Sequence, residues 1–445
     1  MRFPLQYILI DKITNKLISF LRTRLVKNSL YTGLALIFIG LIPFIFNFLV
    51  GRTFGTEILG SINLAISFCL IITIFITNFF GSAGNKYLAE YRGKKDLNNF
   101  LYILKIIFLG SSIILFFAAI ILYLKWDYFF VKFALDENLL VPIIIYLFLR
   151  TLYILLRRSM YGMDLIKQYT FNEIISAFFM LGVVTYVCYT YKPDLLIHSY
   201  LASYFIFLIL CIYTLIKHFK EITVSMNRQN DCSKNDVMKK FSKYGLISMI
   251  GTVASTGTGY LSVIITGIYL DHSEAGVYAA VLSIVSILMF FPKLFTQVFI
   301  PEFSKLFGQG EKKKIVQIFK QASSILFLFS LVICLSLFFI SKKILMLFGQ
   351  DFASGSIILR IILPSIFIRM ISIPSNAFLS GTKYILFPNI GGLIIFAVST
   401  CSWLILVPKY QLAGIAIGYS LGISIGIGYQ IIISIKKLKL FISKI

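Results

Sequence analysis

The sequence predicts an all-α polytopic membrane protein with about twelve transmembrane helices, in two parallel six-helix lobes around a central cavity, with both termini cytoplasmic. Three observations predict it: an apolar composition, twelve apolar runs of spanning length, and an uneven distribution of Lys and Arg between them. Of the 445 residues, 58% are hydrophobic and 13% are charged, and the mean hydropathy is +0.90. Soluble proteins carry about 25% charged residues. The composition therefore excludes secreted soluble proteins and ordinary soluble enzymes.

Twelve runs are long enough to cross a membrane, because a spanning helix needs about 20 mostly apolar residues. The first six lie at approximately 29–50, 58–80, 101–123, 139–157, 171–191 and 196–216. The second six lie at approximately 243–268, 275–299, 315–340, 353–377, 385–406 and 412–432.

The basic residues orient these spans. The net charge of +24 is also typical of nucleic-acid-binding proteins, but here Lys and Arg stand mainly between apolar runs. With a cytoplasmic N-terminus, 31 of the 42 basic residues fall in inside segments, 7 in outside loops and 4 within spans. Since cytoplasmic flanks carry the excess of positive charge, both termini are predicted inside, and no nucleic-acid partner is expected.

Polar intervals divide the chain into a basic N-terminal segment (1–28), a first lobe (29–216), a cytoplasmic linker (217–242), a second lobe (243–432) and a basic cytoplasmic tail (433–445). The interruptions by Asp11, Lys12 and Lys16 argue against a signal peptide in the first segment. Its helical spacing of apolar residues favours an amphipathic helix on the inner leaflet, with a frayed basic tail as the alternative.

The two lobes carry matching glycines. Gly51 and Gly60 flank the first outside turn, and Gly267 and Gly276 stand 216 residues after them in the second lobe. A basic inside loop follows each pair about 25 residues later. An even number of spans per repeat gives both copies the same orientation, and parallel repeats of this kind surround a site near the midplane.

The chain resembles the polysaccharide-exporter branch of the superfamily that also contains the multidrug and toxin extruders, and within it the Wzx-type O-antigen flippases. The resemblance covers about Asn28 to Ile435. It rests on the two-lobe plan, the turn from Gly51-Arg52 to Gly60, the loop Tyr87-Leu-Ala-Glu-Tyr-Arg-Gly-Lys-Lys-Asp96, and the turn Asp271-His-Ser-Glu-Ala-Gly-Val-Tyr278.

The resemblance implies a flippase that moves an undecaprenyl-pyrophosphate-linked oligosaccharide across the bacterial inner membrane by alternating access. Membrane lipids are the other expected contact, and a polysaccharide polymerase and a chain-length regulator are left open as partners. Because such flippases diverge widely, the resemblance supplies no fixed functional positions, and the candidate residues below come from the sequence pattern.

Four basic residues lie within spans, whereas no acidic residue lies in the middle of one. Ionisable groups inside a membrane are costly and indicate function. Arg150 is the strongest candidate, because Tyr146, Arg150, Tyr153 and Arg157 repeat along one face of the fourth span. Guanidinium groups can hold phosphate oxygens and tyrosine rings can stack on sugars. The alternative is that Arg150 reaches the inner headgroups, about 10 Å away.

Arg369 and Arg360 are candidates in the tenth span, on opposite faces of an ideal helix unless Pro364 bends it. Lys293 lies in the inner third of the eighth span, where it can serve the cavity or reach the headgroups. Arg52 is predicted as an interfacial anchor.

Pro43, Gly257, Gly259 and Pro364 are candidate sites for gating, with close helix packing as the alternative for the glycines. The twelfth span carries a predicted packing face of small residues: Gly414, Gly418, Gly422 and Gly426. No CxxC, paired metal ligands or GxxxxGK[ST] occurs, so no metal, cofactor or catalytic residue is predicted. Glu173 and Asp271 are the candidates for a proton site.

Two functions remain beside the oligosaccharide flippase. A multidrug or metabolite antiporter would share the architecture, but a cation extruder needs buried carboxylates that the middle of the spans lacks. A flippase for lipid II would share the composition. A membrane-embedded polymerase or ligase is disfavoured, because the longest outside loop has about 15 residues and no acid–base constellation appears.

Overall fold

The computed structural model describes residues 24–133, 135–224, 226, 234–382 and 384–442, and these form helices and turns without a strand. The all-α fold class is therefore confirmed. The elements are α2 (Arg24–Gly93), α3 (Leu97–Lys105), the π-helical η1 (Ile106–Gly110), α4 (Ser111–Leu124), α5 (Trp126–Lys132), η2 (Glu137–Leu139), α6 (Leu140–Gly162), α7 (Ile166–Thr190), η3 (Pro193–Leu195), α8 (Leu196–Val224), α9 (Lys234–Tyr269), α10 (His272–Leu288), α11 (Phe290–Gly308), α12 (Lys312–Met346), η4 (Gln350–Ser354), α13 (Gly355–Ile371), α14 (Ile373–Ser380) and α15 (Leu386–Ile442).

The described helices are consistent in number with the twelve predicted membrane crossings. Nine helical segments are long and apolar enough to span a membrane. Two of these, α2 and α15, each join two helices at a non-helical residue, Gly55 and Gln411 respectively. Counting both halves of each, together with the shorter apolar helix α10, gives the predicted number.

Helix continues into several segments that the sequence assigned to loops. α8 runs on to Val224 and α9 begins at Lys234, so both ends of the expected 217–242 linker are helical. α15 extends to Ile442 and takes in most of the basic tail. Residues 1–23 and 227–233 lie outside the described part of the chain, so the amphipathic N-terminal helix and the domain limits stay predictions.

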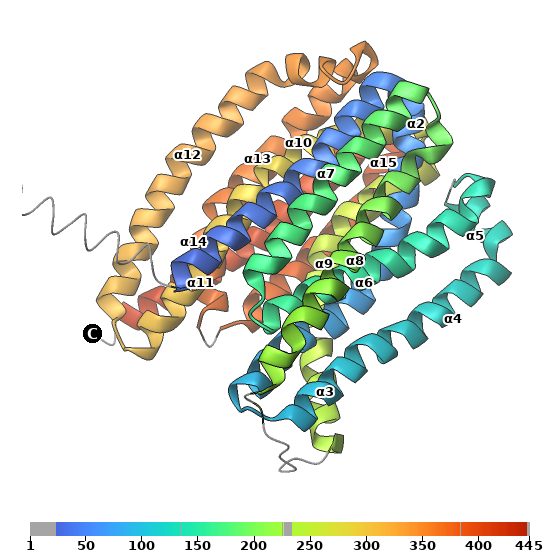
Figure 1. Cartoon of the computed structure of the whole chain (residues 1–445). Coiled ribbons are helices and arrows are strands. Elements are labelled where there is room, and N and C mark those ends of the chain that lie inside the picture. The colour runs from blue at the N-terminus through green and yellow to red at the C-terminus, as the bar shows by residue number, and fades with distance from the viewer. Residues whose placement is uncertain (1–23, 134, 225, 227–233, 383, 443–445) are drawn as a thin grey trace, which may run out of the picture.

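The helices of each lobe pack on one another, and α2 joins the lobes. α2, α6, α7 and α8 form the centre of the first lobe, and α9, α12, α13 and α15 that of the second. α2 also packs along α9 and α10. Figure 1 shows α12 on one flank of the bundle and α3, α4 and α5 on the opposite flank.

The backbones of the two lobes come very close where the repeated glycines meet. A Cβ atom on Gly60 would stand 1.7 Å from the carbonyl oxygen of His272, and one on Gly276 would stand 1.9 Å from that of Thr56. Thr56 Oγ1 and Ser273 Oγ are 2.7 Å apart beside this contact. Only glycine allows α2 and α10 to come this close, which explains the residue type at both positions.

The predicted packing face of the twelfth helix is confirmed. Cβ atoms at all four glycines would collide with the preceding helix within α15, at Leu406, Trp403, Ser399 and Ile395. Trp403 Nε1 donates to the carbonyl oxygen of Ile415 at 3.0 Å. Small residues thus let the two halves of α15 lie against each other.

The turn inside α15 stores backbone strain at Gln411, which has φ 48° and ψ −127°. Strain of this kind costs about 1–3 kcal/mol in a residue with a Cβ atom. A glycine avoids this strain, but because it is more flexible in the unfolded chain, its ordering on folding costs up to about 1 kcal/mol more. We expect Gln411→Gly to stabilise the protein by about 1 kcal/mol in thermal unfolding in detergent. Gln411→Ala keeps the Cβ atom and should give no gain. Equal stability of the two variants would contradict the assignment of strain.

Candidate functional site

The basic and aromatic residues of α6 lie together on the face that packs against α8. The guanidinium carbon of Arg150 lies 5.2 Å from the ring centre of Tyr153, and that of Arg157 lies 5.5 Å from the same ring. Arg157 Nη1 donates to Tyr153 Oη at 3.3 Å. The spacing noted in the sequence therefore produces one continuous stripe, because residues four and seven apart share a helix face.

Tyrosines of α8 complete the surroundings of Arg150. Arg150 Nη1 donates to Tyr204 Oη at 2.8 Å, and its guanidinium lies 5.2 Å from the Tyr204 ring centre. Tyr146 contacts both Tyr200 and Tyr204, with ring centres 6.0 and 5.6 Å apart. These rings hold the arginine by cation–π attraction and a hydrogen bond. We call Arg150, Tyr153, Arg157 and Tyr204 the arginine–tyrosine cluster.

Arg150 keeps hydrogen-bonding capacity that the protein does not use. Its Nε is buried and has no hydrogen-bond partner among the described residues. No described carboxylate forms an ion pair with it. An unpaired guanidinium with a free donor is a strong site for a phosphate or carboxylate ligand.

Glu173 of α7 is the acidic member of this site. Its Oε1 accepts a hydrogen bond from Tyr153 Oη at 2.5 Å, so the hydroxyl of Tyr153 stands between Glu173 and Arg157. The side chain is buried, with 6% of its surface exposed.

The cluster lies beside the border between the lobes. Tyr260 of α9, in the second lobe, is close enough to Arg150 for electrostatic interaction. On the same helix, a Cβ atom at Gly257 or Gly259 would meet no atom within 4 Å. Both glycines therefore leave space for a side chain on the helix that carries Tyr260.

Arg369 and Arg360 are separated in the structure. Arg369 lies near Tyr419 of the twelfth helix, close enough for electrostatic interaction. Arg360 turns to α12 instead: its Nε donates to Ser341 Oγ at 3.0 Å, and its guanidinium lies 5.2 Å from the Phe338 ring centre. The helix passes Pro364 without interruption and breaks at Ser372, before α14 begins. The two arginines therefore do not share one face.

The remaining candidates are placed as follows. Pro43 lies within the first helix of α2, whose only non-helical residue is Gly55. Lys293 is in α11, but its side chain lies outside the described part of the structure. Arg52 is exposed at the outside turn. The roles of these residues in binding and gating stay predictions.

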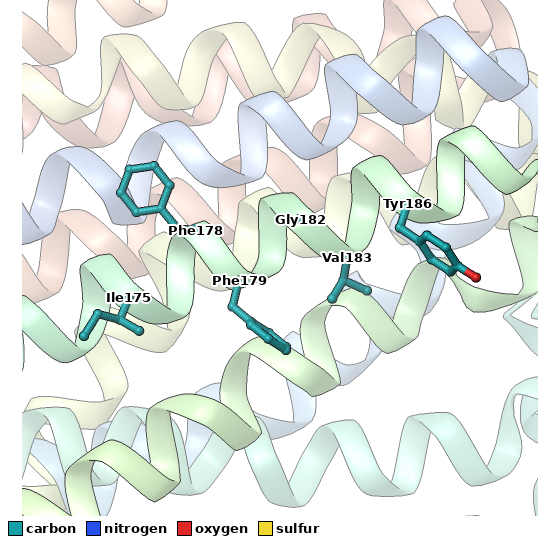
Figure 2. Close-up of a pocket in the computed structure, with 6 residues that line it drawn as sticks. All are labelled: Ile175, Phe178, Phe179, Gly182, Val183 and Tyr186. Atoms are coloured by element: carbon teal, nitrogen blue, oxygen red, sulfur yellow. The ribbon is translucent and has the colours of Figure 1, made fainter.

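The hollow in Figure 2 is not an anion site. It has a volume of about 480 Å³ and is lined on α7 by Ile175, Phe178, Phe179, Gly182, Val183 and Tyr186. None of these side chains carries a charge, and exposed apolar side chains of this kind suit contact with lipid chains.

Comparison with protein-family models shows to which family the chain belongs. A model of the polysaccharide biosynthesis protein family matches residues 25–307, which is more than half of the chain. The chain belongs to that family. A second model, MatE, matches residues 248–404, so matches reach both lobes. The resemblance inferred from the sequence is thereby confirmed at the level of the superfamily. No curated protein matches the sequence.

Solved structures share the fold of this polysaccharide biosynthesis family member. An inward-facing multidrug resistance MATE family transporter of the MOP superfamily matches with TM-score 0.75 and 13% identity, covering 94% of this chain and 96% of that one. The lipid II flippase MurJ in its inward closed conformation matches with TM-score 0.69 and 15% identity, covering 93% and 90%. A MOP superfamily transporter from Pyrococcus furiosus, described as having a binding pocket of reverse polarity, matches with TM-score 0.66 and 13% identity, covering 93% and 96%.

The sequence pattern of this family member did not single out Tyr200, Tyr204, Tyr260 or Arg158. The first two stand four residues apart on α8, a helix-face signal that was available. Arg158 directly follows the fourth predicted span and so falls among the predicted cytoplasmic charges. In the structure it donates to Thr77 O, Ser82 Oγ and Asn78 Oδ1, each at 2.9 Å, and a side chain on Gly81 would collide with it. Arg158 thus connects α6 to α2 through hydrogen bonds.

Proposed function

We propose that this membrane protein is a flippase that moves an undecaprenyl-pyrophosphate-linked oligosaccharide repeat unit across the bacterial inner membrane by alternating access. The observation that carries the proposal is Arg150, a partly buried guanidinium at the lobe border. Among the residues that the structure describes, it has no paired carboxylate and its Nε has no hydrogen-bond acceptor. Such a group favours an anionic passenger, because removing a charge from water without a partner is costly.

The surroundings of Arg150 suit both parts of such a substrate. The guanidinium groups of Arg150 and Arg157 can bind the pyrophosphate, and Arg369 offers a further positive charge in the second lobe. Tyrosine rings present flat apolar faces and hydroxyl groups to sugars. The polymerase and chain-length regulator that use the exported unit are proposed as functional partners.

Deletion of the gene tests the proposal. We expect loss of the surface polysaccharide on a gel and accumulation of undecaprenyl-pyrophosphate-linked repeat units on the cytoplasmic leaflet. Restoring the gene should reverse both effects. If the surface polymer persists and only drug sensitivity changes, the protein is instead a multidrug or metabolite antiporter.

A lipid II flippase is the second candidate, supported by the fold shared with MurJ. Lipid II and the oligosaccharide carrier share the polyprenyl pyrophosphate, so the arginines suit either. The deletion strain separates them: accumulation of lipid II with cell lysis would support this candidate, whereas normal growth without surface polymer would support the first.

A further inference from the structure

Glu173 and Asp96 are the buried acidic residues of the part of the chain that the structure describes. Asp96 lies between two spans and caps α3 by accepting a hydrogen bond from Asn99 N. Glu173 has one oxygen on Tyr153 Oη, whereas Oε2 is buried and has no hydrogen-bond partner among the described residues. No described Lys or Arg nitrogen lies within ion-pair distance of it. A carboxylate so placed is costly to keep charged.

The elements packed against α7 near Glu173 place charged or titratable groups around it. From α6, Tyr153, Arg157 and Arg150 face it, with both arginines close enough for electrostatic interaction. α8 contributes Cys211, which also interacts electrostatically with Glu173.

The other neighbours are neutral. Tyr169 lies on α7 itself, one turn before Glu173. α2 contributes the ring of Tyr31, whose carbonyl oxygen accepts from Thr170 at 3.1 Å. η3 packs near the opposite end of α7. The positive charge that compensates Glu173 therefore comes from the arginine–tyrosine cluster.

The hydroxyl of Tyr153 couples the acid to the arginines. It accepts a hydrogen bond from Arg157 and donates one to Glu173, while the ring lies against Arg150. An anionic ligand bound to these arginines would neutralise their positive charge. Glu173 would then carry a poorly compensated negative charge near that of the ligand, and binding a proton on Oε2 removes the conflict.

We propose that Glu173 is a proton-binding site linked to anion binding at the arginine–tyrosine cluster. When the anion binds, Glu173 takes up a proton from the bulk solution. When the anion leaves, Glu173 releases that proton to the bulk solution. Linkage is reciprocal, so protonation of Glu173 strengthens anion binding by the same factor. This inference rests on the proposed function, because it assumes an anionic ligand at Arg150 and Arg157.

Titration calorimetry on the full chain in lipid nanodiscs, with inorganic pyrophosphate as the probe, tests the linkage. Repeating the titration in buffers of different ionisation enthalpy gives the number of protons taken up. We expect wild type to take up about one proton more per pyrophosphate than Glu173→Gln. For each fall of one pH unit, the affinity of the wild type for pyrophosphate should rise by a factor up to about ten times larger than the factor for Glu173→Gln. Glu173→Gln keeps an oxygen acceptor for Tyr153, which favours retention of the fold.

Two further variants sharpen the test. Tyr153→Phe removes the bridging hydroxyl but keeps the ring, and it should lose most of the extra proton uptake. Glu57→Gln, at an exposed position in the outside turn, should behave as wild type.

The outcomes separate the two proposals. Equal proton uptake by wild type and Glu173→Gln, with binding that still depends on Arg150, overturns only the proton linkage. If wild type does not bind pyrophosphate, or if Arg150→Gln leaves that binding unchanged, the anion site of the proposed function is overturned and the linkage with it.

Discussion

Replacing Arg150 with glutamine is expected to abolish surface polysaccharide while leaving the protein folded in the membrane. A charge-assisted hydrogen bond to a phosphate contributes about 2–3 kcal/mol, so the affinity for the pyrophosphate group should fall roughly 30- to 150-fold. Glutamine retains a hydrogen-bond donor that can reach toward Tyr204, which limits the structural damage. The measurement is complementation of the deletion strain, together with pyrophosphate binding by the purified variant.

Arg52→Gln is the matched control, because it removes the same charge from an exposed position at the outside turn. It should complement fully. If Arg150→Gln reaches wild-type levels in the membrane and restores the polymer as well as Arg52→Gln does, Arg150 does not bind the substrate.

Gly60→Ala is expected to separate the lobes at their outside contact. The new methyl group would stand 1.7 Å from His272 O, and overpacking of this kind costs about 1–3 kcal/mol. The contact can be followed with Thr56→Cys and Ser273→Cys together, because the hydroxyl oxygens of the native residues are 2.7 Å apart. In a background without the six native cysteines, this pair should form a disulfide, and Gly60→Ala should reduce its yield at least about fivefold.

Gly182→Ala provides the control for the substitution itself, since its methyl group would meet no atom within 4 Å. It should leave cross-linking and complementation unchanged. Cross-linking in Gly60→Ala at the wild-type level would show that α2 and α10 tolerate a side chain there, contrary to the contact that the structure describes.

The sequence predicted the architecture well, because membrane insertion leaves a strong pattern. Each crossing must be apolar over a known length, and the basic residues orient it. The turns inside α2 and α15 were therefore expected between the right runs. The glycines at 60 and 276 were recognised as a repeat, and their contact explains why the residue type recurs.

The candidate site was harder to predict, because facing directions depend on helix rotation and tertiary contacts. The stripe on α6 followed from local periodicity. The orientation of Arg360 toward α12 did not, since it depends on contacts with Phe338 and Ser341, about 20 residues away. Arg158 is likewise defined by partners on α2 some 80 residues earlier. Spacing along one helix cannot encode such partners.

The reciprocity of the outside contact has a meaning for the origin of the molecule. His272 stands at the position of Thr56 in the repeat, so Gly60 meets His272 just as Gly276 meets Thr56. Two surfaces that each supply both halves of a contact form an isologous interface, the kind found between identical subunits with two-fold symmetry. Duplication and fusion of the gene for a homodimeric protein would produce this geometry. In a fused chain the two halves can change independently, which identical subunits of a homodimer cannot do.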